Sequence, residues 1–304
     1  MGLCGGDTNW EVQGHEDVAI AKILVPATGT PRDDVAIAAA VQAAKLFNSH
    51  VLVQFVHPDP AEAIPLVGVP LSGEAMQAII DGQTKFAQAA AARARESMTA
   101  VCQREGVEII KAPECRPAAT CSFRQIWGNA DRLICDAAKL SDLVVFGPVR
   151  WRDSPEINEA FLDVLRSVRR PVLVANHAPS GRLRKIAIGW DGSAFAAHAI
   201  CSAIPFLQHV EQILVVVVHR RGAASLPTQE LTDYLARNGL SFVLRVVDAG
   251  DTAPAEALMA EAMTAGADML IAGGYGHDHL WETFFGGVTE KLLARAEIPV
   301  LFAH

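Results

Sequence analysis

Short apolar runs alternate along this chain with longer stretches in which apolar residues recur at helical spacing. Continuous runs such as ILVVVV at 213–218 are typical of strands that are buried on both faces of a parallel sheet. This alternation of strands and helices predicts an α/β fold with a doubly wound, mostly parallel sheet and right-handed crossovers.

The pattern assigns most of the chain to particular elements. In the first half we expect strands at 22–26, 50–56, 120–127, 142–146 and 171–175, and helices near 32–47, 72–105, 129–140 and 155–168. In the second half we expect strands at 186–190, 213–218, 241–247, 269–273 and 299–303, and helices at 194–208, 227–238, 253–265 and 287–296. Residues 106–119 fit either a further short strand or a loop.

The two halves repeat one layout. AKILVPATGT at 21–30 and RKIAIGWDGS at 184–193 both run from a charged residue through an apolar strand into a turn of small residues. The endings also correspond, because SDLVVFGP and RRPVLVAN in the first half match ADMLIAGG and EIPVLFAH in the second. A repeat of this length predicts two copies of one fold in tandem.

The repeat sets the expected domain organisation. We expect a flexible acidic arm at 1–19, a first domain at 20–178 and a second domain at 182–304, joined by a Pro- and Gly-containing linker. The long Ala-rich stretch at 72–105 is an insertion in the first copy.

Composition and charge narrow the classes of partner. The chain has 304 residues, of which 51% are hydrophobic, so a sizeable core is expected and disorder is excluded. Its formal net charge of −8 argues against nucleic acid as a partner. No apolar run reaches the roughly 18 residues needed to cross a membrane, and residues 1–19 lack the apolar core of a signal peptide. The six cysteines include no CxxC pair, so we expect reduced thiols in a cytoplasmic protein.

One glycine-rich loop carries the candidate chemistry. Gly273 and Gly276 follow an expected strand, and Gly286 and Gly287 open the next helix after nine intervening residues. Glycines let a ligand approach the backbone, and a helix start offers free N–H groups to a phosphate. Asp191 follows the first strand of this half and is placed to accept hydrogen bonds from a ribose or a base. Tight turns alone would also explain the glycines, and Asp191 or the nearby Ser193 would also serve as a helix cap.

These residues resemble the universal stress protein family, and the chain looks like a tandem member with two such domains. The resemblance rests on a strand that ends in Asp191, on the pattern Gly273-x-x-Gly276-x9-Gly286, and on the closing strand Pro299-Val300-Leu301. It covers nearly the whole chain from about residue 20. It implies two domains packed about a pseudo-twofold axis through their closing strands, which is an intramolecular pseudo-dimer.

The family resemblance also implies a nucleotide site in the second half. Residues at the positions that contact ATP in nucleotide-binding members are Asp191, Val218, Gly273, Gly276, Gly286 and Gly287. Gly287 departs from the family pattern, which has Ser or Thr at that place. Backbone N–H groups, with Mg²⁺, would then hold most of the phosphate.

The first half departs further from the pattern. Thr28 stands where Asp191 stands, and Arg150 stands at the position of Gly276. Asn158 and Glu159 replace Gly286 and Gly287. We therefore expect this half to have lost nucleotide binding.

Other arrangements of reactive residues are weaker. His277-Asp278-His279 has no evident third ligand nearby, so no metal site is expected. Glu282 beside His277 would suit an acid–base pair, but their spacing does not require it. The chain has neither a G-x-S-x-G elbow nor a G-x4-G-K-(S/T) loop, and we assign no catalytic residue.

The sequence therefore predicts a stress-response regulator that binds ATP or a related adenine nucleotide in its C-terminal half. It is not expected to be a dedicated enzyme, and slow ATP hydrolysis is left open. The alternative is a dimeric scaffold or chaperone-like regulator that binds no nucleotide and uses the same fold for protein contacts. An adenylate-transferring enzyme of related fold ranks last, because its motifs are missing. A homodimer of the whole chain and an unidentified protein partner are also left open.

Overall fold

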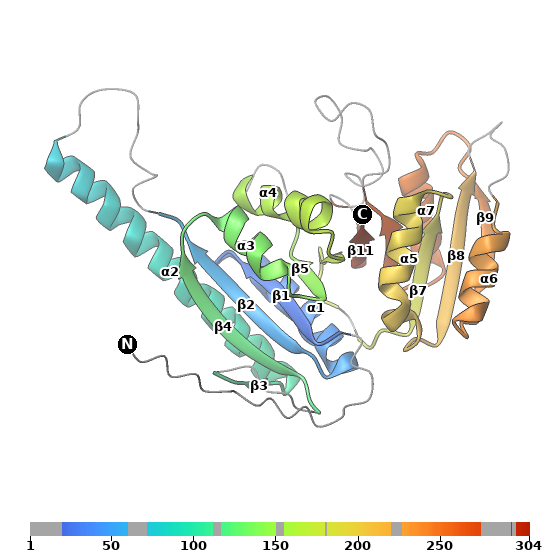
Figure 1. Ribbon diagram of the computed structural model, residues 1–304, viewed down its shortest axis with the longest axis horizontal. Helices are drawn as coiled ribbons and strands as arrows, with labels where there is room; N and C mark the ends of the chain where they lie inside the picture. The colour runs from blue at the N-terminus through green and yellow to red at the C-terminus, as the bar shows by residue number, and fades with distance from the viewer. Residues whose placement is uncertain are drawn as a thin grey trace, which may run out of the picture.

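A computed structural model of the protein describes residues 20–59, 72–111, 117–149, 155–179, 181–219, 227–274, 293 and 296–304. Within these residues the strands form one eleven-stranded sheet in the order β3-β4-β2-β1-β5-β6-β11-β10-β7-β8-β9. Figure 1 shows this sheet running through the whole molecule with helices on both of its faces. The predicted α/β fold with a mostly parallel sheet is confirmed.

The first half contributes six strands. Its elements are β1 (Lys22–Ala27), α1 (Arg32–Phe47), β2 (His50–His57), α2 (Gly73–Glu105), β3 (Glu108–Ile109), β4 (Thr120–Trp127), α3 (Ala130–Ala138), β5 (Leu143–Phe146), α4 (Pro155–Asp163), a π-helical turn (Val164–Val168) and β6 (Val172–Val174). The part of 106–119 that the structure describes contains the short strand β3, which pairs with β4.

The second half contributes five strands. Its elements are β7 (Lys185–Trp190), α5 (Ala194–Leu207), β8 (Gln212–His219), α6 (Gln229–Arg237), β9 (Val243–Asp248), α7 (Pro254–Thr264), β10 (Met269–Gly273) and β11 (Val300–Ala303). The helix predicted at 287–296 lies almost wholly outside the described residues.

The closing strands of the two halves pair with each other, as the family resemblance implies. β6 and β11 are antiparallel, with Leu301 opposite Leu173, whereas the other strand pairs of the sheet are parallel. Antiparallel pairing of two equivalent strands is the arrangement that a local twofold axis produces. The apolar clusters on both faces of the sheet contain residues of both halves. The junction is therefore part of one continuous core.

Helix ends follow from local chemistry. Ser72, Asn129 and Ser193 each accept a backbone N–H in the first turn of the helix that follows them. Helix α2 has 33 residues, and Figure 1 shows its N-terminal end extending beyond the edge of the sheet. Among the described helices, none is both long and apolar enough to cross a membrane.

Candidate functional site

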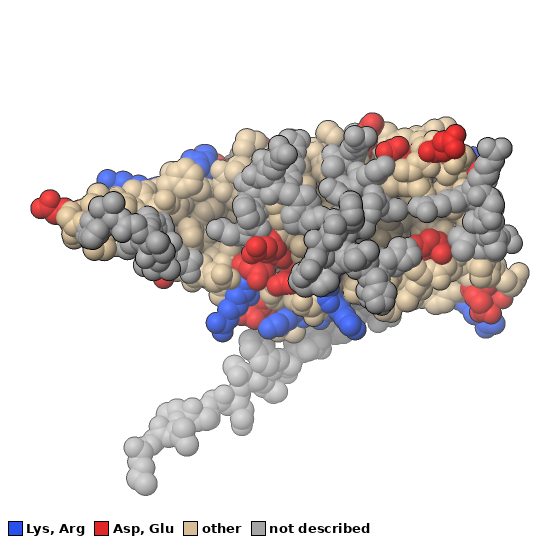
Figure 2. Space-filling view, turned by 90° about the horizontal axis from the view of Figure 1, so that it is seen from above, with Lys and Arg blue, Asp and Glu red and all other residues tan. Residues whose placement is uncertain are grey.

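The carboxyl ends of three neighbouring strands bring predicted site residues to one edge of the sheet. Strand β7 lies between β10 and β8. Asp191 directly follows β7, Val218 is the penultimate residue of β8, and Gly273 is the last residue of β10. This is the edge at which open parallel sheets bind ligands. Figure 2 looks onto this side of the molecule and shows acidic side chains at several places on it.

Asp191 lies in the turn between β7 and α5. Its Oδ1 accepts the backbone N–H of Ser193 at 2.9 Å, and the Ser193 hydroxyl accepts the N–H of Ala196 at 3.1 Å. The capping role considered for Ser193 is therefore present. The Asp191 side chain is exposed, so its carboxylate is accessible to a hydrogen-bond donor from outside the chain.

Gly273 is required by close packing at this edge. A Cβ atom at this position would lie 2.6 Å from the backbone nitrogen of Ala196, in the first turn of α5. The helix therefore meets the end of β10 directly, and its first N–H groups lie at the start of the glycine loop. This contact explains the glycine by packing alone, and it also positions a helix N-terminus where a phosphate is expected.

Val218 is half-buried and packs against the apolar cluster on the α7 side of the sheet. On the neighbouring strand β7, the indole N–H of the last residue, Trp190, donates to the carbonyl of Pro227 at 3.3 Å. This bond fastens the residues before α6 to the end of β7. The predicted residues Gly276, Gly286 and Gly287 lie outside the described residues, as do His277, His279 and Glu282.

The corresponding turn of the first half is occupied by protein groups. The Asp33 carboxylate accepts the backbone N–H groups of Thr28 at 2.9 Å and Gly29 at 2.7 Å, and the Thr28 hydroxyl at 2.8 Å. Asp33 is only 2% exposed, and burial raises the pKa of its carboxyl group. The Asp33 side chain therefore already accepts the hydrogen bonds of the N–H groups that an anionic ligand would need.

Helix α2 also covers this turn. The Arg93 Nε donates to the carbonyl of Gly29 at 2.9 Å. A Cβ atom on Gly29 would lie 2.4 Å from the carbonyl oxygen of Ala90. Sequence reasoning missed Asp33 and Arg93; the Asp next to a helix start was a visible signal, but the contact with α2 is long-range.

The remaining predicted residues of the first half are only partly described. Asn158 is buried in α4, and Gly147 packs tightly, because a Cβ there would lie 2.8 Å from the carbonyl oxygen of Arg32. Arg150 lies outside the described residues.

One group of potential metal ligands was not anticipated. Asp131, Cys135 and Asp163 each offer one ligand atom, and these atoms lie within 4.8 Å of one another between α3 and α4. Burial and the neighbouring Asp163 raise the pKa of the Asp131 carboxyl group. The cluster is partly exposed and lies in the first half, away from the strand ends of β7, β8 and β10.

The mostly parallel sheet with helices on both faces is that of a doubly wound α/β protein. An accessible carboxylate and a tightly packed glycine lie at the carboxyl ends of adjacent strands, where such sheets bind ligands. Residues 182–304 match the model of the Universal stress protein family. This part of the chain is therefore similar to a universal stress protein domain.

Solved structures extend the same fold over nearly the whole chain. A universal stress protein from Archaeoglobus fulgidus DSM 4304 is similar with a TM-score of 0.63 at 13% identity, over 92% of this chain and 94% of that one. A putative universal stress protein from Pseudomonas aeruginosa UCBPP-PA14 has a TM-score of 0.51 at 17% identity, over 93% and 92%. A comparison with curated proteins finds no match. The predicted resemblance is confirmed, by family for the second half and by fold for the chain.

Proposed function

We propose that residues 182–304 bind ATP or a related adenine nucleotide, and that the protein is a cytoplasmic stress-response regulator controlled by that binding. The observation that carries the proposal is the position of Asp191, Val218 and Gly273 at the ends of three adjacent strands. These are the described members of the set that the family resemblance assigns to the nucleotide.

The chemistry of these groups fits a nucleoside. An exposed carboxylate at Asp191 accepts hydrogen bonds from ribose hydroxyls, and a half-buried Val218 offers an apolar surface to a base. The first turn of α5, pressed against Gly273, adds the positive end of a helix dipole. Residues of the glycine loop would hold the phosphates, and Mg²⁺ would neutralise part of their charge.

The two halves are proposed to differ in this function. In the first half, Asp33 takes up the N–H groups of the turn, and α2 lies against Gly29. We therefore assign one nucleotide site to each chain, in the second half.

Isothermal titration with ATP and Mg²⁺ tests the proposal. We expect one site per chain, and we expect Asp191→Ala or Gly276→Arg to abolish or strongly weaken binding. Thr28→Ala, at the equivalent position of the first half, is the matched control and should retain wild-type affinity. Phosphate release in the same samples decides whether bound ATP is slowly hydrolysed.

Absence of binding up to millimolar nucleotide would overturn the proposal and favour the scaffold or chaperone-like regulator. Wild-type affinity in Gly276→Arg would show that the site lies elsewhere.

A further inference from the structure

A cavity of about 750 Å³ lies at the junction of the two halves. It lies at the amino ends of the strands β7, β10 and β11, whereas Asp191 lies at the carboxyl end of β7. It is bordered by residues just before β7, β10 and β11, including Leu183, Asp268 and Pro299. Its volume falls within the range of about 300–1,000 Å³ that is usual for small-molecule sites. We call it the junction cavity.

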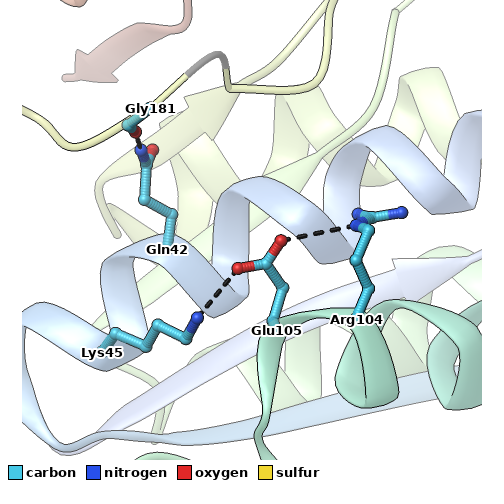
Figure 3. Close-up of polar contacts among 5 residues, drawn as sticks. All are labelled: Gln42, Lys45, Arg104, Glu105 and Gly181. Atoms are coloured by element: carbon cyan, nitrogen blue, oxygen red, sulfur yellow. Dashed lines mark hydrogen bonds and ion pairs between the residues drawn. The ribbon is translucent and has the colours of Figure 1, made fainter.

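The walls of the junction cavity come from both halves and from the linker. Helices α1 and α5 form its sides, and Leu173 of β6 lines it from the sheet. The two helices meet where Phe47 contacts Phe206 edge to face, with ring centroids 5.0 Å apart. The Gln42 side chain donates to the carbonyl of Gly181, which fastens the linker to α1 (Figure 3). Most of the lining is apolar, so the cavity suits an apolar molecular body.

One end of the junction cavity is basic. Figure 3 shows Glu105 between two cations. Its Oε2 accepts from the Lys45 ammonium at 2.8 Å, and its Oε1 accepts from the Arg104 Nε at 3.4 Å. A single carboxylate therefore serves two cationic groups, which leaves one positive charge in excess.

The remaining charged lining residues, Asp268 and Arg182, cancel each other in charge, so the excess stays at one positive charge. Asp268 Oδ2 accepts the backbone N–H groups of Arg184 and Lys185, both at 2.8 Å, so this carboxylate already has partners. Arg182 lines the cavity, and within the described part of the chain its guanidinium group has no hydrogen bond or ion pair. Three cations face two carboxylates that are already bonded.

We propose that the junction cavity binds a small amphipathic anion, with its apolar body between Leu173 and Phe206 and its carboxylate or sulfonate beside Arg104 and Arg182. The one excess positive charge selects for an anion, and the apolar walls select against a free inorganic ion. Because the lining comes from both halves, such a ligand bridges the junction. The site is separate from the proposed nucleotide site and does not depend on it.

Titration of the full-length protein with 1-anilinonaphthalene-8-sulfonate, followed by its fluorescence, tests this site. We expect one saturable site per chain that saturating ATP with Mg²⁺ does not displace. The neutral analogue N-phenyl-1-naphthylamine has the same apolar body without the sulfonate, and it should bind about tenfold more weakly or worse, because it lacks the charge-assisted contact.

Variants locate the probe. Arg104→Gln combined with Arg182→Gln should weaken binding of the sulfonate about tenfold and leave the neutral analogue unchanged. Arg182→Glu alone, at an exposed residue whose replacement does not threaten folding, should weaken the sulfonate in the same direction. Lys139→Gln is the control, because Lys139 pairs with Asp136 on the surface of α3 and does not line the cavity.

Failure of the sulfonate to saturate, its competitive displacement by ATP, or wild-type affinity in the arginine variants would each overturn the proposal. A missing response to ATP in the nucleotide titration would leave this result unaffected, because neither probe measurement requires a bound nucleotide.

Discussion

Replacing Gly29 by alanine tests whether α2 really closes the turn of the first half. Gly29 has a φ of +72°, and a Cβ there would lie 2.4 to 2.7 Å from backbone atoms of Ala90. The left-handed backbone costs about 1 kcal/mol for alanine, and the overlap adds about 1–3 kcal/mol because backbone rather than a side-chain tip must move. We expect Gly29→Ala to lower the free energy of unfolding by about 2–4 kcal/mol.

Gly106→Ala is the matched control. Gly106 ends α2 with a φ of +66°, but a Cβ there would have no atom within 4 Å. Alanine at this position should therefore cost only the backbone strain, about 1 kcal/mol. Urea unfolding followed by tryptophan fluorescence and far-UV circular dichroism measures both variants, with coincident transitions required for the comparison.

The difference between the two variants isolates the contact between α2 and the β1–α1 turn. Equal losses in Gly29→Ala and Gly106→Ala would refute the reasoning, because strain alone would then explain both. The explanation for the proposed loss of nucleotide binding in the first half would also lose its steric part, leaving only the carboxylate of Asp33.

Three further predictions follow from contacts elsewhere. Gly273→Ala should lower the free energy of unfolding and abolish nucleotide binding, because its Cβ would lie 2.6 Å from the backbone of α5. Gly189→Ala should lower the free energy of unfolding less, since its Cβ meets only the end of a leucine side chain. Equal effects of the two variants in urea unfolding and calorimetric titration would contradict this. Burial raises the pKa of the Asp33 carboxyl group, so the folded state binds this proton more tightly than the unfolded state does. The free energy of unfolding of the wild type relative to Asp33→Asn should therefore fall as the pH rises from the unfolded pKa of about 4 through the raised folded pKa. A difference that does not change with pH would contradict this. Burial raises the pKa of the Cys135 thiol to about 12, so iodoacetamide at pH 8 should modify the exposed Cys201 well before Cys135. Mass spectrometry of the peptides measures the order, and earlier modification of Cys135 would contradict the raised pKa.

Periodicity along the sequence was sufficient for most elements because the central strands, such as β1, β5 and β11, are buried on both faces. The run at 213–218 predicted a strand, and β8 covers it as Gln212–His219. The family resemblance, rather than the periodicity, implied that the closing strands meet, and Leu301 lies opposite Leu173. The short strand β3 had no such signal, since a pair of exposed residues carries no apolar pattern.

The candidate site was only partly accessible to sequence reasoning. Asp191 and Gly273 each come at the end of an apolar run that the sequence already predicts to be a strand. Their places at the ends of these strands could therefore be predicted from neighbouring residues alone. Asp33 and Arg93 act on the first-half turn through contacts that depend on tertiary structure, and Arg93 lies 64 positions from its partner Gly29. Such a contact requires the placement of α2, which no local pattern specifies. The extents of the two domains and the residues of the glycine loop stay predictions.

The turns after the first strand of each half have different surroundings, and this difference can be traced to the element that follows the second strand. In the first half this element is α2, whose 33 residues correspond to about 50 Å of helix, long enough to cross the β1–α1 turn and extend beyond the sheet. In the second half it is α6, whose nine residues correspond to about 14 Å, and the residues before it are held by the bond from Trp190 to Pro227. A shorter helix leaves Asp191 exposed, whereas the longer one places Ala90 and Arg93 against Gly29. The same long helix ends at Arg104 and Glu105, so the helix whose Ala90 and Arg93 lie against the β1–α1 turn also supplies charged residues of the junction cavity at the opposite ends of the strands.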